Sequence, residues 1–201
     1  MGTYNLSTTV GTADTGHAVR HNEERAAIND LDSRVAALSG SLVTGIFVGA
    51  PQFVGLAGSP DAVTIGAGFG AAVWNLDDSS TEIITASIQL PATWNTFSVY
   101  TWWCTKTAAV GNVDMQARVR TVLPGALSNA SETIGTSLTR AAAGTAFQVV
   151  KSLEGSFAIT PVSDKTARPM THVSVRRLGA NTTDTLTGDV AILGVELVQL
   201  T

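Results

Sequence analysis

From residue 42 to the end of the chain, hydrophobic and polar residues alternate with a period of two, and turn-forming residues interrupt the alternation. A period of two places successive side chains on opposite faces of an extended strand. Many short strands without a second long helix predict an antiparallel, jelly-roll-like β-sandwich over residues 41–201. The predicted strands are residues 42–48, 62–65, 71–76, 82–90, 96–104, 113–122, 146–153, 156–160, 172–178 and 189–200.

Two of these strands carry hydrophobic side chains on both faces. In the strand that begins at Thr96, Trp103 lies on one face, whereas Tyr100 and Trp102 lie on the other. A strand with one face in water avoids large rings on both sides, so either both faces are covered within the protomer or one face covers a neighbouring subunit. In the last strand Leu193, Val195 and Leu197 lie on one face and Val190, Ile192, Val198 and Leu200 on the other, which again indicates burial on both sides. Alternatively, a β-bulge near Gly194 shifts the phase and explains the pattern without any partner.

A helical period precedes the strands. Within residues 16–40, the positions that share one helix face are spaced alternately by four and three residues. This heptad pattern predicts a short coiled-coil helix. The helix ends at Gly40, and Asp14 or Thr15 caps its first turn. A stripe this narrow favours contact with identical helices, although a single surface helix on its own chain is the alternative interpretation. The predicted oligomerisation residues form the seam His17, His21, Glu24, Ile28, Leu31, Val35 and Leu38.

The polar half of the seam allows two hypotheses. In a symmetric coil, His17 and His21 form rings near the axis, close to Glu24. Such rings can hold a metal or an anion, or loosen on protonation. Alternatively they are hydrated side chains that fix register and oligomer number, and we prefer this second hypothesis. We therefore predict no metal site and no cofactor.

Residues 1–15 are rich in Thr, Ser and Gly, with Tyr4, Leu6 and Val10 as hydrophobic anchors. Such a segment buries too little hydrophobic surface to offset the ordering of its backbone. We expect a flexible arm that becomes ordered on a partner, although a disordered tail has the same composition.

Charge argues against several classes of partner. Charged residues make up 14% of the chain and its net charge is −4, so no basic surface for nucleic acid or an acidic membrane is predicted. The pairs Arg118/Arg120 and Arg176/Arg177 are interpreted as solvated strand positions. No hydrophobic run reaches the roughly 20 residues of a membrane span, and the amino terminus lacks a secretory signal pattern. We expect the chain to stay in a reducing compartment unless it is exported or released by lysis.

No catalytic motif is present. Cys104 lies in the hydrophobic run VYTWWC, which indicates a buried, inert thiol. His172 has no acidic neighbour in sequence and no GxSxG elbow accompanies it, so an ordinary strand residue is predicted. The glycine-rich IGAGFGAAVW lacks the spacing of a phosphate loop, and Asp77 and Asp78 have the pattern of a turn. We predict that the protein is not an enzyme.

The segment TTVGTADTGHAVRHNEERAAINDLDSRVAALSG, residues 8–40, resembles the neck of virion fibre and minor tail proteins of tailed bacteriophages. The stretches LPATWNTFSVYTWW and SVRRLGANTTDTLTGDVAILGVELVQL resemble sandwich heads of phage fibres and capsid decoration proteins. The resemblance implies a homotrimeric structural virion protein, assembled in the host cytoplasm, whose arm binds other virion proteins; the heptads alone also permit a dimer. The matching neck positions are Gly16, His17, His21, Asn22, Ala26, Ala27, Ile28 and Leu31.

A second function remains open. Tryptophan rings can stack on sugars, so the sandwich is alternatively a carbohydrate-binding receptor-recognition module that contacts a host surface glycan. Trp74 and Trp94 are the candidate glycan-binding residues, with Asn95 or Asp77 as polar partners. Under the structural hypothesis these tryptophans belong to the core of the sandwich.

Overall fold

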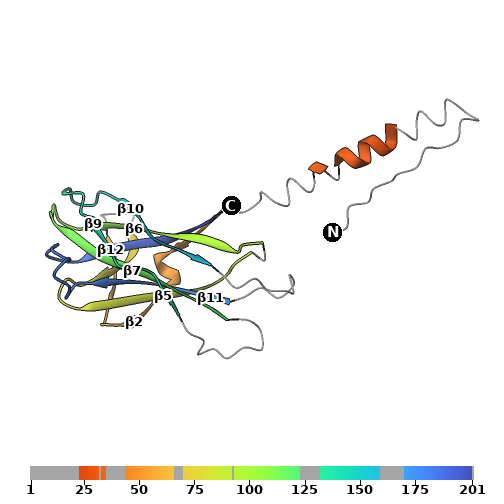
Figure 1. The fold of residues 1–201 in the computed structure, drawn as a ribbon. Helices are drawn as coiled ribbons and strands as arrows, with labels where there is room; N and C mark the ends of the chain where they lie inside the picture. Colours follow the sequence, from red (N-terminus) through yellow and green to blue (C-terminus); the bar gives the residue numbers. More distant parts are fainter. Residues whose placement is uncertain are drawn as a thin grey trace, which may run out of the picture. The chain divides into compact units, whose positions relative to one another are not determined.

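The chain divides into two compact units, Met1–Val43 and Thr44–Thr201 (Figure 1). The boundary lies three residues after the predicted end of the helical segment at Gly40. The computed structural model describes residues 23–31, 33–34, 44–65, 70–91, 93–122, 132–158 and 170–200.

The first unit contains a helix, which covers residues 23–31 and 33–34 in the described part of the chain. It carries three seam residues, Glu24, Ile28 and Leu31. The side chains of Ile28 and Leu31 are 47% and 60% exposed. The coiled coil and the trimer stay predictions. The other predicted arm and seam residues lie outside the described part, namely Tyr4, Leu6, Val10, His17, His21, Val35 and Leu38.

The second unit is an antiparallel β-sandwich of two six-stranded sheets, as the alternation predicts (Figure 1). Sheet A has the strand order β10-β6-β12-β4-β3, and β1 also pairs with β12. A short 3-10 helix, η1 at Ala50–Gln52, follows β1. The strands of sheet A are β1 (Gly45–Gly49), β3 (Asp61–Ile65), β4 (Ala71–Leu76), β6 (Thr96–Thr105), β10 (Val150–Ala158) and β12 (Val190–Gln199).

Sheet B has the strand order β2-β5-β11-β7-β8, and β9 also pairs with β7. Its central strand β11 is in register with β5 on one side and β7 on the other along nearly its whole length. The strands of sheet B are β2 (Val54–Ala57), β5 (Thr81–Gln89), β7 (Asn112–Val122), β8 (Thr133–Ile134), β9 (Leu138–Ala141) and β11 (Met170–Leu178).

The predicted and observed strands differ in two respects. The predicted strands at 146–153 and 156–160 form the single strand β10, whose register shifts between Leu153 and Gly155. Gly155 has a φ of 144°, a conformation that glycine adopts readily, so the predicted break between two strands is a bulge within one strand. The strands β2, β8 and β9 have two to four residues each and are not among the predicted strands, because so short a run carries no recognisable period.

One hydrophobic core fills the space between the two sheets. Inward residues of β6 and β12 supply its centre, since these two strands lie in the middle of sheet A. Its largest fully buried hydrophobic side chains include Leu76, Ile84, Leu90, Phe97, Trp103, Met115, Ile192 and Leu197.

The predicted bulge in the last strand is confirmed. The register between β12 and β6 shifts between Ile192 and Gly194, so Val190 and Val195 both face the core. A Cβ at Gly194 would lie 2.6 Å from the carbonyl oxygen of Val48, and only glycine fits there. The phase change of this strand therefore needs no partner chain.

The outer face of sheet A is also hydrophobic. Towards β3 and β4, the buried side chains of Val73, Cys104 and Ala191 form a small second cluster, against which Val63 and Leu193 pack. Both faces of β6 thus carry hydrophobic side chains, as its sequence predicts. This half of the outer face is covered by residues of the same chain.

Candidate functional site

The other half of the outer face of sheet A carries an aromatic strip, which we define as Phe47, Tyr100, Trp102, Lys151 and Glu196. The strip runs across four neighbouring strands, β1, β12, β6 and β10. Cross-strand register places Phe47 opposite Glu196, Glu196 opposite Tyr100, and Lys151 opposite Trp102. Residues that pair across strands in this way point to the same face of the sheet.

The members of the strip are in direct contact. The rings of Phe47 and Trp102 meet edge to face, with centroids 6.2 Å apart and an interplanar angle of 87°. The ammonium of Lys151 lies 4.5 Å from the centroid of the Tyr100 ring and 5.4 Å from that of the Trp102 ring. Nζ of Lys151 lies 2.8 Å from Oε2 of Glu196, and the same oxygen accepts a 2.9 Å hydrogen bond from Nε1 of Trp102.

These contacts fix the charges of the strip. The hydrogen bond from Lys151 and the bond from Trp102 lower the pKa of Glu196, against the opposing effect of burial. Glu196 is therefore ionised at neutral pH and paired with the ammonium of Lys151. Phe47 is 54% exposed. The strip combines ring surface with a fixed acceptor and donor, which suits a flat ligand with a hydrophobic face and a polar rim.

The sequence indicated only part of this strip. The double-sided hydrophobicity of the strand at residues 96–104 singled out Tyr100 and Trp102. Phe47, Lys151 and Glu196 were missed, because they come from three other strands and only the register brings them together. No local pattern in the sequence carries that information.

The structure separates the two predicted glycan-binding tryptophans. Trp94 is 3% exposed and packs in the core, 6.3 Å from the ring centroid of Phe97. No ring face is left for a ligand, so Trp94 is corrected to a core residue. Trp74 is half-buried, and its Nε1 donates a 3.0 Å hydrogen bond to the carbonyl of Ala50. It lines a shallow depression of about 460 Å³ with residues 55–60, apart from the strip.

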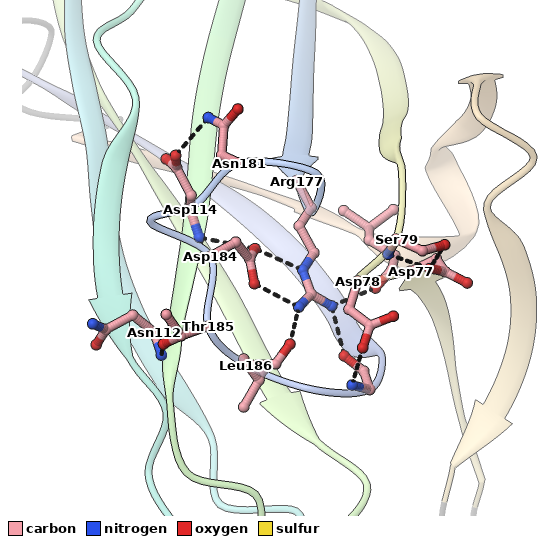
Figure 2. Close-up of polar contacts among 12 residues, drawn as sticks. Asp77, Asp78, Ser79, Asn112, Asp114, Arg177, Asn181, Asp184, Thr185 and Leu186 are labelled. Atoms are coloured by element: carbon pink, nitrogen blue, oxygen red, sulfur yellow. Dashed lines mark hydrogen bonds and ion pairs between the residues drawn. The ribbon is translucent and has the colours of Figure 1, made fainter.

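A buried polar network closes one end of the sandwich (Figure 2). Arg177 is fully buried and makes a bidentate ion pair with Asp184, at 2.9 Å from Nε and 2.8 Å from Nη2. Its remaining hydrogen bonds go to the carbonyls of Leu76, Leu186 and Gly188, so all its N–H groups have partners. Arg177 thus anchors the β11–β12 loop, which corrects its predicted place among solvated strand residues.

Two acidic residues near this network accept hydrogen bonds from neighbouring loops and turns. Asp114 accepts a hydrogen bond from Asn181 at 2.9 Å (Figure 2). It also accepts one from Thr183 at 2.7 Å. Asp77 accepts from the backbone and hydroxyl of Ser79, both at 2.6 Å, in the turn that the sequence predicts. Across the described residues, no group of three or more His, Cys, Asp or Glu side chains is arranged to hold a metal ion.

The two residues considered for catalysis, Cys104 and His172, lie on different sheets. Cys104 is 1% exposed, and burial raises the pKa of its thiol. His172 lies on the outer face of sheet B, where its Nδ1 is 2.7 Å from the hydroxyl of Ser87. Burial and the nearby Arg120 lower the pKa of His172. The helix in the described part of the chain is too short to span a bilayer.

Comparison with known proteins finds likeness in fold alone. No family model matches the chain, and no curated protein matches its sequence. A native family 35 carbohydrate binding module from Clostridium thermocellum is 9% identical, with a TM-score of 0.51, and the match covers 79% of this chain and 100% of the module. An Arthrobacter globiformis T6 isomalto-dextranase complexed with panose is 12% identical, with a TM-score of 0.53, and the match covers 77% of this chain but 23% of that enzyme. The sandwich therefore has the jelly-roll-like fold of these proteins.

Proposed function

We propose that the β-sandwich is a carbohydrate-binding module and that its ligand lies across the aromatic strip. The observation that carries this proposal is the combination of three ring side chains with a fixed carboxylate and ammonium pair on one solvent-facing area. The flat surface suits an extended oligosaccharide better than a single enclosed sugar.

The chemistry of a sugar matches this surface. A pyranose has a face of C–H groups, which packs on aromatic rings, and a rim of hydroxyl groups, which need donors and acceptors. Glu196 accepts hydrogen bonds from hydroxyls and Lys151 donates to them. Because these two side chains already hold one another, they are positioned before the ligand arrives, which lowers the entropic cost of binding.

The names of the similar structures agree with this proposal. One is a carbohydrate binding module and the other is an enzyme in complex with panose. Neither of these two proteins is a virion protein by name. This likeness of fold therefore supports the carbohydrate-binding hypothesis over the structural virion role, which the resemblance of the neck and head sequences implies.

The test is a substitution of Trp102 in the full chain. We expect Trp102→Ala to lower the affinity for a bound polysaccharide at least tenfold, because the central ring and its contacts with Phe47 and Glu196 are lost. Affinity electrophoresis in gels containing neutral polysaccharides, followed by calorimetry on those that retard the protein, measures this change. Trp102→Phe keeps a ring but removes the Nε1 donor, and we expect an intermediate affinity.

Trp74→Ala is the matched control, because it removes a half-buried tryptophan outside the strip. Circular dichroism verifies that each variant is folded. Equal affinity of Trp102→Ala and the unchanged protein would contradict the proposal. Loss of binding in Trp74→Ala alone would move the site to the depression beside β2.

A second function remains a candidate because of the helix. Ile28 and Leu31 are exposed hydrophobic residues in a heptad pattern, and such a seam favours self-association. We propose that the helix joins copies of the chain and that the arm attaches them to a phage particle as a fibre, minor tail or decoration protein. Three joined modules would bind a host glycan with greater avidity than one, so the two functions are compatible.

A further inference from the structure

The outer face of sheet B gathers three arginines that the sequence left as separate pairs. Arg118 and Arg120 lie on β7, two residues apart and therefore on the same face, with side chains roughly 7 Å apart at their base. Arg176 lies on the neighbouring strand β11, directly opposite Gln116. In the same register, His172 pairs with Arg120. These residues form what we call the arginine face: Arg118, Arg120 and Arg176.

Few acidic groups balance the arginine face. Glu132 pairs with Arg118 at 3.2 Å, and Asp114 is buried and holds Asn181 and Thr183. His172 adds no negative charge, and its pKa is lowered by burial and by Arg120. Positive charge thus exceeds negative charge on this face, although the whole chain has a net charge of −4.

The three arginines are half-buried. Nε of Arg118, of Arg120 and of Arg176 is buried without a hydrogen-bond partner among the described residues, so a ligand on this face would reach each guanidinium through its terminal Nη groups. Burial and the neighbouring Arg118 lower the pKa of Arg176, against the opposing effect of the carboxylates of Asp114 and Glu132. Arg118 already has the carboxylate of Glu132 as a partner. A partly desolvated guanidinium without such a partner gains strongly from an anion, since charge-assisted hydrogen bonds are stronger than neutral ones.

We infer that the arginine face binds the acidic groups of an anionic polysaccharide, either carboxylates or sulfates. A guanidinium presents parallel N–H donors that match both groups. The inference adds a second face to the proposed carbohydrate-binding function, and this face is independent of the aromatic strip because it belongs to the other sheet. Ligand contacts there are ionic, whereas contacts on the strip depend on rings.

The composition of the face favours a glycan over a nucleic acid. Between and beside the arginines lie the hydroxyls of Thr85, Ser87 and Ser174, which suit sugar hydroxyls. None of the strands β5, β7 and β11 contains Phe, Trp or Tyr, so single-stranded bases find no ring to stack on. A duplex binder needs more basic residues than three, and the net negative charge of the chain opposes a densely charged polymer.

The test compares two double variants of the full chain. Arg120→Gln/Arg176→Gln removes two charges from the arginine face, and Arg34→Gln/Lys106→Gln removes two charges elsewhere. The probes are polygalacturonate, dextran sulfate and, as a neutral reference, dextran, measured by calorimetry at low and high salt. We expect the first double variant to bind the charged probes at least tenfold more weakly at low salt, with a smaller salt dependence. We expect the control variant to retain the affinity of the unchanged protein.

Equal weakening in both double variants would overturn the inference, because net charge alone would then explain binding. Failure of the unchanged protein to bind either charged probe at low salt would also overturn the inference. Tighter binding to single-stranded DNA than to the charged polysaccharides would assign the face to nucleic acid instead. Arg120→Lys/Arg176→Lys keeps the charge and should restore part of the affinity. Trp102→Ala should leave binding of the charged probes intact, so this inference and the proposed function can fail separately.

Discussion

Glu154 is a carboxyl group enclosed between the two sheets. It is fully buried on β10 beside Ser152, whose hydroxyl donates to it and accepts a 2.9 Å hydrogen bond from Nε1 of Trp103. Its Oε2 has no partner in the described part of the chain. Burial raises the pKa of Glu154 to about 7, although the Ser152 bond and the charge of Arg140 lower it. Below about pH 7 the neutral form therefore predominates in the folded state.

This carboxyl group makes stability depend on pH. Between its ordinary pKa near 4.5 and its folded pKa of about 7, the folded state binds more protons than the unfolded state, so stability falls as pH rises. The full loss by pH 8 is about 3 kcal/mol, from 1.36 kcal/mol for each unit of pKa. We expect Glu154→Gln to remove most of this loss, as measured by urea unfolding at pH 5, 6, 7 and 8.

The matched control is Glu196→Gln. The pKa of Glu196 is lowered, so its stabilising contribution is present above the ordinary pKa and is lost only in acid. This variant should keep the decline between pH 5 and 8. A decline of the same size in Glu154→Gln and in the unchanged protein would show that another group is responsible.

At the scale of elements, Arg177 links the end of β11 to the β11–β12 loop through four hydrogen bonds and to β4 through a fifth, to the carbonyl of Leu76. Removal of one partner from a buried ion pair leaves the other charge unpaired. We expect Arg177→Met to lower the free energy of unfolding by about 3–5 kcal/mol. Arg177→Lys keeps the charge but not the forked geometry and should be intermediate.

The comparison for this prediction is the exposed pair between Arg34 and Asp30, whose charged atoms are 3.9 Å apart. Arg34→Gln should change the stability by less than about 0.5 kcal/mol, as exposed pairs on helices do. Chemical denaturation monitored by tryptophan fluorescence measures both variants. A small effect of Arg177→Met would mean that the loop is held by other contacts.

The sandwich was predictable because the period of two is local information, and so was the bulge at Gly194. The sites were less predictable. Trp102 and Glu196 share one strip, and Arg120 and Arg176 share one face, because strands distant in sequence pair in a particular register. Arg177 directly follows Arg176, but alternation turns it inward to Asp184. No sequence signal distinguished these two neighbouring arginines.

At the scale of the whole molecule, we propose that the helix sets how many copies of the sandwich are joined. We expect the full chain to form trimers, and Ile28→Ser/Leu31→Ser to form monomers, because the substitutions remove two exposed hydrophobic seam residues. Light scattering coupled to size exclusion at micromolar concentration measures the mass. Asp30→Asn/Arg34→Gln, at outer positions of the same helix, should leave the trimer intact.

A monomeric full chain at micromolar concentration would contradict the proposed assembly. It would leave the proposed carbohydrate binding by a single sandwich unaffected, since the aromatic strip lies within residues 44–200. The module would then act through one copy, and avidity would contribute nothing to its affinity.

The extra residue in β12 determines which changes of chain length the fold tolerates. Before the bulge at Gly194, Val190 and Ile192 face inward; after it, Val195 and Leu197 do so. Without the bulge, strict alternation after Ile192 would turn Gly194 and Glu196 inward and Val195 and Leu197 outward. The extra residue thus keeps the carboxylate of Glu196 on the outer face, and deletion of one residue there would remove the bulge without exchanging the two faces.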